Sequence, residues 1–267
     1  KISEGFNIIK KKKIESYRLI EEFMIAANTC VAKFLKDNKL NSIFRSHEKP
    51  KLDKIQSLKK ILRENNIYNN ERFNNQKDFN TTLKAMKENK VFLNEALLRT
   101  QSKAVYSNKN EGHFGLGLNF YTHFTSPIRR YSDLNVHRDL VDFFFERKRN
   151  KIEPNLFEHL TSQEKKSDAI ERKILERACS LYLRNQKKKY FKGIVDGIEP
   201  FGIFVRAIDL PFSCLVKSRF NNYWDKKSSR TENKFRIGQM VTFKIKRNNI
   251  KTGKILAEDL KILNEKL

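Results

Sequence analysis

The character of the sequence changes once along the chain, within residues 185–189. Before this stretch, apolar residues recur at helical spacing, and after it short alternating runs separated by glycines replace them. Helical spacing buries one stripe of a helix, whereas alternation buries one face of a strand. The sequence therefore predicts an α+β protein with two domains, a mostly helical one over 1–187 and an all-β one over 188–267.

The second domain is predicted to be a small barrel of five short strands. Its run GIVDGIEPFGIFV resembles the S1 class of the OB-fold. Such barrels bind single strands by stacking bases on exposed aromatic side chains inside a basic groove. Phe204 fits the barrel core as well as the RNA face, and Trp224 either stacks on a base or anchors its loop. The residues assigned to RNA contact on this basis are Phe201, Phe204 and Phe191 for stacking, and Lys217, Arg219 and Arg247 for phosphates.

The charge balance also points to a nucleic acid. The chain has 56 Lys and Arg residues against 31 Asp and Glu, which gives a net charge of +25. Neutralising phosphates and releasing their counterions is the largest source of affinity for nucleic acids that does not depend on sequence. About half of the lysines can be assigned to an ordinary solvated surface, yet an excess of this size still favours a polyanionic partner.

Other sequence features narrow the class of protein. The three cysteines, Cys30, Cys179 and Cys214, are few and far apart, so neither a disulfide framework nor a zinc site is indicated. A reducing cytoplasm is the expected location. No apolar run reaches the roughly 18 residues that a membrane span requires, so no membrane association is expected.

A first helix is predicted over 17–37, with Ser16 as its N-cap. Acidic residues occur early in this helix: Glu22 projects opposite the apolar stripe, and Glu21 lies on its flank together with Asn28. The apolar stripe, which is predicted to be buried, comprises Ile20, Phe23, Met24, Ala27, Val31, Phe34 and Leu35.

Residues 113–138 concentrate three His, three Arg and two Tyr around a Thr-Ser-Pro turn. Ser126 and Pro127 are typical of an N-cap and first helical residue, and the unpaired N–H groups of a helix start can hold a phosphate. On that helix Arg130 falls on the apolar stripe and is interpreted as a paired, structural residue. Arg129 points roughly 100° away and is the better phosphate contact.

The same segment carries a family resemblance. The run YTHFTSPIRRY, followed by DL and VHR, and the run RLIEEFMIAAN both resemble the ribonuclease II and ribonuclease R family of 3′→5′ exoribonucleases. The resemblance implies that a Glu of the first helix places the 3′-terminal nucleotide. Glu21 and Glu22 both remain open, with helix geometry favouring Glu21. It also implies that Arg129 contacts the phosphate backbone, and that Glu171, on a helix over about 161–185, lies near the active centre.

The implied activity is processive, Mg²⁺-dependent hydrolysis of single-stranded RNA to nucleoside 5′-monophosphates. In this family the Mg²⁺ is held by closely spaced aspartates, and no two aspartates of this chain are adjacent or two apart. The metal site is therefore expected before Lys1, and the chain alone is expected to be inactive. The implied partner is single-stranded RNA, bound by a monomer that associates with the ribosome or the RNA-decay machinery. The alternative is a non-catalytic RNA-binding S1 protein.

Four further local predictions concern the first domain. A helix is expected from about Lys51 and another over about 90–103. His47 is interpreted as a packing or hydrogen-bonding residue, and the alternation of Leu116, Leu118 and Phe120 predicts a short strand.

Overall fold

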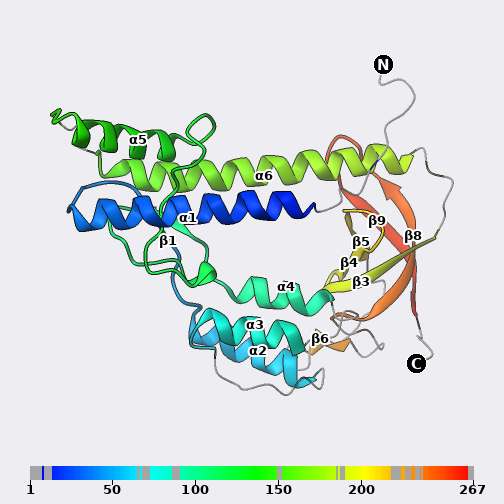
Figure 1. The fold of residues 1–267 in the computed structure, drawn as a ribbon. Helices are drawn as coiled ribbons and strands as arrows, with labels where there is room; N and C mark the ends of the chain where they lie inside the picture. Colours follow the sequence, from blue (N-terminus) through cyan, green and yellow to red (C-terminus); the bar gives the residue numbers. More distant parts are fainter. Residues whose placement is uncertain are drawn as a thin grey trace. The chain divides into compact units, whose positions relative to one another are not determined.

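The computed structural model describes residues 8, 14–64, 67, 73–85, 91–148, 152–184, 186, 190–217, 224–225, 230–231, 235 and 237–263. The chain divides into two compact units, residues 12–166 and, as the second unit, residues 167–267 together with 1–11. The division falls inside the long helix α6 (Asn155–Arg184), which is drawn in yellow-green in Figure 1. Among the described residues, no helix combines the length and apolar character needed to cross a membrane.

The main core of the first unit is built around two helices and a small sheet. Helix α1 (Glu15–Asp37) is followed by strand β1 (Phe44–Ser46), which pairs antiparallel with β2 (Val105–Ser107). Helix α5 (Tyr131–Phe144) packs on the same core, and so does the first part of α6. The buried residues at its centre are Ala32, Leu35, Leu40, Ile43, Phe44, Tyr106 and Val136.

Helix α1 departs from the prediction in two ways. It begins at Glu15 after Ile14, and no side chain caps it, so the assignment of Ser16 as N-cap is wrong. Its buried face is centred on Asn28, Ala32 and Leu35, whereas Ile20 and Phe23 of the predicted stripe are 56% and 64% exposed. The N-terminal half of α1 carries apolar residues on more than one face, so spacing alone did not locate the buried one.

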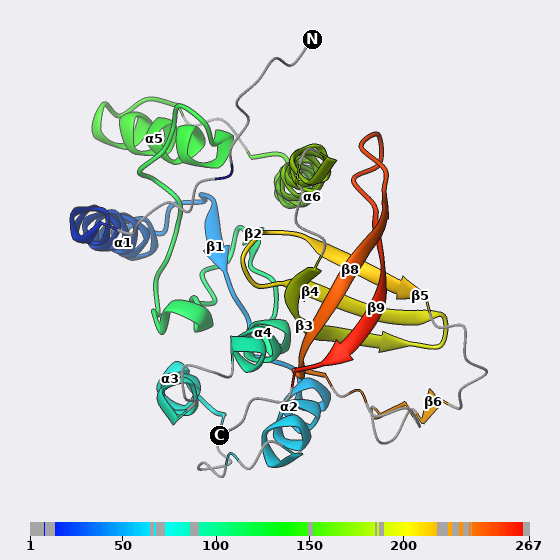
Figure 2. The same cartoon turned by 90° about the vertical axis from the view of Figure 1, so that its right-hand side faces the viewer.

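A second cluster in this unit joins three further helices, α2 (Leu52–Glu64), α3 (Gln76–Ala85) and α4 (Val91–Thr100), seen together in Figure 2. The helices expected near Lys51 and over 90–103 are confirmed. The buried residues of this cluster are Leu58, Leu62, Ile67, Phe73, Phe79, Leu93 and Leu97.

The strand predicted from Leu116, Leu118 and Phe120 is wrong. Residues Phe114–Leu116 form a short 3-10 helix, η1, instead. Gly117 ends it with a φ of 67°, a left-handed conformation that glycine adopts without strain. The N–H of His113 then donates to the Leu118 carbonyl over 2.7 Å, which closes the loop on itself.

The second unit contains a closed five-stranded barrel, which Figure 2 shows clearly. The strands follow the order β3-β4-β5-β9-β8, and every neighbouring pair is antiparallel except β5 and β9. This confirms the predicted α+β class and the OB-type barrel. The strands are β3 (Tyr190–Glu199), β4 (Gly202–Ala207), β5 (Ser213–Lys217), β8 (Met240–Asn248) and β9 (Ile255–Ile262), and a separate short pair is formed by β6 (Trp224–Asp225) and β7 (Arg230–Thr231).

The C-terminal half of α6 packs against this barrel. Cys179 and Leu183 join the barrel core, and the Asn248 side-chain amide donates to the Ser180 carbonyl over 2.8 Å. Ile170 and Ile174 of the same helix are 57% and 60% exposed. Among the described residues of α6 in the second unit, the barrel covers Cys179 and Leu183.

Candidate functional site

A pocket of about 520 Å³ opens in the first unit beside α1. Six of its lining residues come from the N-terminal half and middle of α1, and the others come from the loop around η1 and the segment that leads into α5. The lining residues are Tyr17, Ile20, Glu21, Met24, Ile25, Asn28, Leu116, Tyr121 and Arg130.

The pocket combines a largely apolar wall with a few polar groups. Glu21 contributes a carboxylate, whereas Glu22 is not among the lining residues. Asn28 is buried and ties the loop to α1, because its side-chain oxygen accepts from the Phe124 N–H over 2.9 Å. Its amide nitrogen donates to the Tyr121 hydroxyl over 3.2 Å. The geometry therefore favours Glu21 over Glu22 as the group that faces a ligand.

The predicted helix start at Ser126 and Pro127 is wrong. The Ser126 carbonyl accepts from the N–H groups of Arg129 and Arg130, over 3.3 and 3.1 Å, so residues 126–130 form a turn. Arg130 then has an extended backbone with φ −123° and ψ 118°, and α5 begins only at Tyr131. The physical reason is that the Ser126 N–H donates over 2.8 Å to the carboxylate of Asp133, which fixes the turn ahead of the helix.

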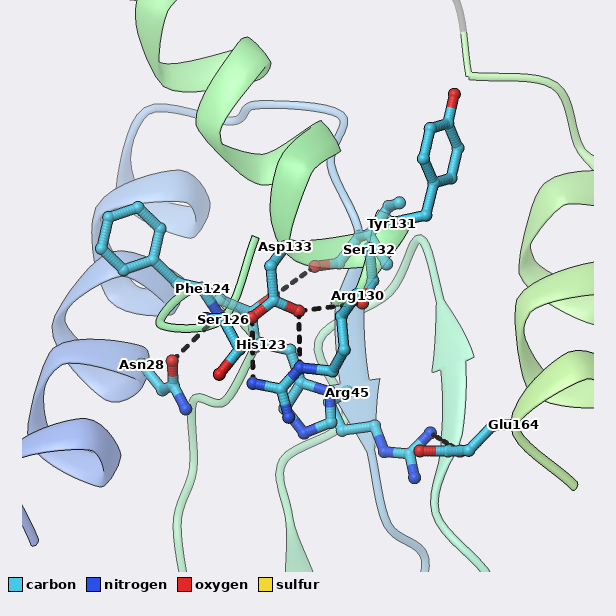
Figure 3. A network of polar contacts seen from close by, with 12 residues as sticks. Asn28, Arg45, His123, Phe124, Ser126, Arg130, Tyr131, Ser132, Asp133 and Glu164 are labelled. Atoms are coloured by element: carbon cyan, nitrogen blue, oxygen red, sulfur yellow. Dashed lines mark hydrogen bonds and ion pairs between the residues drawn. The ribbon is translucent and has the colours of Figure 1, made fainter. Parts of the chain in front are cut away.

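Asp133 is the centre of this arrangement (Figure 3). It is fully buried, and its two oxygens accept from Nε and Nη2 of Arg130, each over 2.9 Å. The Ser132 hydroxyl donates to the same carboxylate over 3.1 Å. A bidentate pair of this kind is strong and geometrically specific. Arg130 is therefore a paired, structural residue, as predicted, although it also borders the pocket.

Arg129 differs from Arg130 in its surroundings and not in helical phase. Neither residue lies inside α5, so the argument from the 100° rotation falls away. Arg129 is exposed on the turn, next to Ile128, which is 98% exposed. A guanidinium held at the tip of a fixed turn can reach a phosphate without first breaking a buried ion pair. Its role as the phosphate contact stays a prediction.

A layer of uncharged aromatic groups lies behind the turn. The Tyr106 hydroxyl and Nδ1 of His123 are 2.9 Å apart, and the hydroxyl oxygens of Tyr106 and Ser132 are 3.3 Å apart. Burial, helped by the nearby Arg130 and Arg45 charges, lowers the pKa of His123 to about 3. Burial also raises the pKa of Tyr106. Both groups are neutral near pH 7, so neither supplies charge to a ligand.

Arg45 anchors this layer from β1. Its guanidinium carbon lies 4.6 Å from the centre of the Tyr106 ring, and Nη1 pairs with Glu164 over 2.7 Å. Figure 3 shows this pair beside the Asp133 network. Sequence reasoning missed Tyr106 and Glu164, because their partners lie on other elements. It also missed Asp133, whose partners lie in the turn directly before it.

His47 and His113 are also structural groups. Nδ1 of His47 accepts from the Gly115 N–H over 2.7 Å, and Nε2 donates to the Ser102 carbonyl over 2.6 Å. Both nitrogens are thus committed, which confirms His47 as a hydrogen-bonding residue. The His113 ring stacks on His47 at 4.9 Å, and burial, helped by the nearby Arg45 charge, lowers the pKa of His113 to about 4.

In the barrel, the three aromatic residues assigned to stacking differ in their exposure. Phe191 is 3% exposed inside the core and faces Phe243, so its assignment to RNA contact is wrong. The alternation of β3 turns its side chain inward. Phe201 is 58% exposed and packs edge-on against the half-buried Phe204 at 5.9 Å, so both remain available for stacking.

The charged barrel candidates remain predictions. Lys217 and Arg247 are exposed, at the end of β5 and on β8. Arg219 lies outside the described residues, and so does the side chain of Trp224. Glu171 is exposed on α6 in the second unit.

The described residues do not fit a Mg²⁺ ion. Within the ranges that the structure describes, no group of three His, Cys, Asp or Glu side chains could hold a metal. The buried carboxylate of Asp133 is already occupied by Arg130 and Ser126. No metal-assisted step is therefore assigned to these residues.

Comparison with known proteins places this geometry in a family. The RNB domain model matches residues 3–146, which is more than half of the chain. The chain belongs to the RNB family. The matched region includes α1, the pocket, the Ser126 turn and α5.

Several relatives of this RNB protein are bacterial ribonucleases R. It is 32% identical over 262 residues to ribonuclease R of Mycoplasmopsis pulmonis, with 90% of this chain and 36% of that protein covered. It is 30% identical over 268 residues to ribonuclease R of Escherichia coli, with 90% of this chain and 33% of that protein covered. The chain thus spans about a third of the length of these relatives.

Solved structures give the same assignment. The apo form of Mycoplasma genitalium ribonuclease R has a TM-score of 0.80 at 28% identity, over 95% of this chain and 42% of that one. The same enzyme in complex with ribose-methylated single-stranded RNA has a TM-score of 0.79.

Proposed function

We propose that this RNB chain is the RNA-binding portion of a ribonuclease R-type 3′→5′ exoribonuclease. The complete enzyme would hydrolyse single-stranded RNA processively to nucleoside 5′-monophosphates. The observation that carries the proposal is the pocket, in which Glu21 of α1 and the turn locked by Asp133 form adjoining walls. Both segments come from the sequence runs that resemble the family.

The pocket residues suit the end of an RNA strand. The apolar wall of Tyr17, Ile20 and Met24 can accept a base, because every base offers an apolar face. The Glu21 carboxylate can accept hydrogen bonds from the two hydroxyls of a terminal ribose. Arg129, on the turn beside the pocket, would bind the adjoining phosphate through its planar fork of donors. Mg²⁺ is expected to be held by residues outside this chain, so the chain's own contribution is to bind and orient the strand.

Recognition of the free 3′ end is the test. Affinity of the chain for one single-stranded RNA is compared when the strand ends in a 3′-hydroxyl or a 3′-phosphate. The added phosphate should weaken binding because it meets Glu21 and removes a ribose donor. Glu21→Gln should reduce this preference, and Glu22→Gln should leave it unchanged. Equal affinity for both ends in the unmodified chain would contradict the proposal.

A second candidate function is RNA binding without hydrolysis. It is favoured by the barrel, where the exposed Phe201 and the exposed cations are sufficient to hold a single strand without any chemistry. The two functions share their RNA contacts and differ in the metal site. An aspartate cluster encoded ahead of Lys1, with chelator-sensitive release of nucleotides by the encoded protein, would support the enzyme.

A further inference from the structure

The outer surface of three barrel strands carries an exposed tyrosine that is fixed at both ends. Tyr190 is the first residue of β3 and is 48% exposed. Its register partner on β8 is Lys244, and β8 lies between β3 and β9 in the barrel. The Tyr190 hydroxyl donates over 2.8 Å to Oδ2 of Asp259 on β9. The tyrosine side chain therefore crosses the outside of β8.

An irregularity in β9 positions Asp259 for this hydrogen bond. Thr242 of β8 pairs with Lys261, and Lys244 pairs with Glu258. Between these two pairs β9 has one residue more than β8, and such a bulge re-aims a side chain. Asp259 has a φ of 55°, a left-handed conformation that is costly for a residue with a Cβ and that often marks a functional position. The anchor of the tyrosine ring is therefore a built feature of β9.

Lysines lie beside the ring. The neighbouring row on the outer surface runs from Lys192 on β3 through Thr242 on β8 to Lys261 on β9. Lys192 is exposed and forms no ion pair with another described residue. The surface around the ring, here called the Tyr190 face, comprises Tyr190, Lys192, Lys244, Lys246, Glu258, Asp259 and Lys261.

The Tyr190 face is positively charged, because its four lysines outnumber its two carboxylates. Lys244 and Lys246 share the carboxylate of Glu258 over 3.7 and 3.0 Å, and Lys261 lies 3.4 Å from Asp259. Exposed ion pairs of this kind are weak, so phosphates can compete for these lysines. An aromatic ring among lysines is the combination that holds a single strand, by stacking on a base and pairing with the backbone.

We propose that the Tyr190 face is a second RNA-binding surface of the barrel, where the ring stacks on a base and the lysines bind the adjoining phosphates. It is separate from the surface expected around Phe201 and Phe204. Phe204 pairs with Gly197, which lies far along β3 from Tyr190, roughly 20 Å at the usual rise of a strand. One barrel would therefore hold two segments of a strand. The inference extends the RNA binding of the proposed function and does not depend on hydrolysis.

Affinity for a single-stranded RNA of about 16 nucleotides, the upper end of an OB-fold site, provides the test. Tyr190→Phe keeps the ring, whereas Tyr190→Leu keeps only an apolar side chain. Both lose the same hydroxyl, so their melting temperatures should be similar. Tyr190→Leu should weaken binding about fivefold or more, and Tyr190→Phe should weaken it less. Ile174→Ala, at a position 60% exposed on α6 in the same unit, should leave the affinity unchanged.

The salt dependence of binding tests the lysines separately. Lys192→Ala should lower the salt slope by about one phosphate contact. The matched control is Lys36→Ala, at an exposed position in the last turn of α1, which should leave the slope unchanged.

Photo-crosslinking to RNA that contains bromouridine locates the contact. Crosslinks to Tyr190 should form in the unmodified chain and persist in Phe201→Ala. Equal affinity of Tyr190→Leu and Tyr190→Phe, or crosslinks confined to Phe201 and Phe204, would overturn the proposal. Weaker binding by Phe201→Ala with no change in Tyr190→Leu would uphold the RNA binding of the proposed function and reject the second surface. Absence of RNA binding by the unmodified chain would reject both.

Discussion

At the scale of single residues, one carboxylate gives two adjacent arginines different surroundings. Asp133 is fully buried and takes both donors of the Arg130 fork, which leaves Arg129 as the exposed arginine at the tip of the turn. The sequence analysis also predicted different roles for the two arginines, but it argued from the 100° rotation between consecutive residues of a helix. These two arginines lie in a turn, where that rotation does not apply. The correct cause is the ion pair, which joins two residues only three positions apart and was still not considered.

Substitution by lysine should separate the two roles. In a catalytically complete protein, Arg129→Lys should cost about 2.7–4 kcal/mol of transition-state stabilisation, the range seen when one donor to a growing charge is lost. Its melting temperature should hardly change. Arg130→Lys should instead destabilise the fold by about 1–3 kcal/mol, because Lys cannot satisfy both oxygens of the buried Asp133. Turnover and thermal unfolding of both variants check this, and equal small losses in both would contradict it.

The buried histidines give the fold a defined response to acid. An unfolded His has a pKa near 6.5, whereas in the folded chain the pKa is about 4 for His113 and about 3 for His123. Below pH 6.5 the unfolded chain binds protons at these histidines, whereas the folded chain does not. The free energy of unfolding should therefore fall as the pH drops from about 6.5 to about 4, with a further contribution from His123 down to about 3.

Urea unfolding at several pH values between 7 and 4 measures this slope. His123→Asn should make the slope shallower because one buried site no longer titrates. The matched control is His159→Asn, at an exposed position on α6, which should leave the slope unchanged. A slope that is unaffected by His123→Asn would show that other groups cause the acid sensitivity.

At the scale of elements, the helices and barrel strands follow from sequence periodicity, but their buried faces do not always follow. The N-terminal half of α1 offers two apolar faces, and only the contacts with the rest of the unit decide which is covered. In β3, alternation indicated a strand at Phe191 without saying which way the ring points. Phe201 is exposed beside Gly202 at the strand turn, where a Cβ would lie 2.5 Å from the Val216 carbonyl oxygen, and its contact with RNA stays a prediction.

The barrel aromatics should therefore respond differently to truncation. Phe201→Ala should weaken binding of single-stranded RNA by about 1–3 kcal/mol without changing its salt dependence, because a stacking surface and no charge is lost. Lys217→Ala should reduce the salt slope by about one phosphate contact. Phe191→Ala should instead cost about 3–5 kcal/mol of stability, because it empties part of the core. Affinity against salt concentration and thermal unfolding distinguish these outcomes, and loss of folding in Phe201→Ala would place that ring in the core.

At the scale of the whole chain, the family and the α+β class could be predicted from two sequence runs and one change of periodicity. The site could be predicted only in part. Glu21 and Arg129 stay predictions that rest on the family runs. Tyr106 and Glu164 gain their structural roles from contacts between elements, and Asp133 gains its role from the turn directly before it. The position of the metal site was inferred only from the spacing of the aspartates. The described residues contain no group of three His, Cys, Asp or Glu side chains that could hold a metal ion.

The chain by itself should therefore bind RNA and leave it intact. Phosphodiester hydrolysis of this type needs a metal that activates water and stabilises the developing charge. The pocket supplies a carboxylate, an amide and a paired arginine, of which the amide and the arginine are already committed to structural hydrogen bonds. Labelled single-stranded RNA incubated with the purified chain and Mg²⁺ should release no mononucleotides, although it should bind. Robust release that a chelator abolishes, and that Arg129→Lys reduces, would show that the chain holds a metal site of its own.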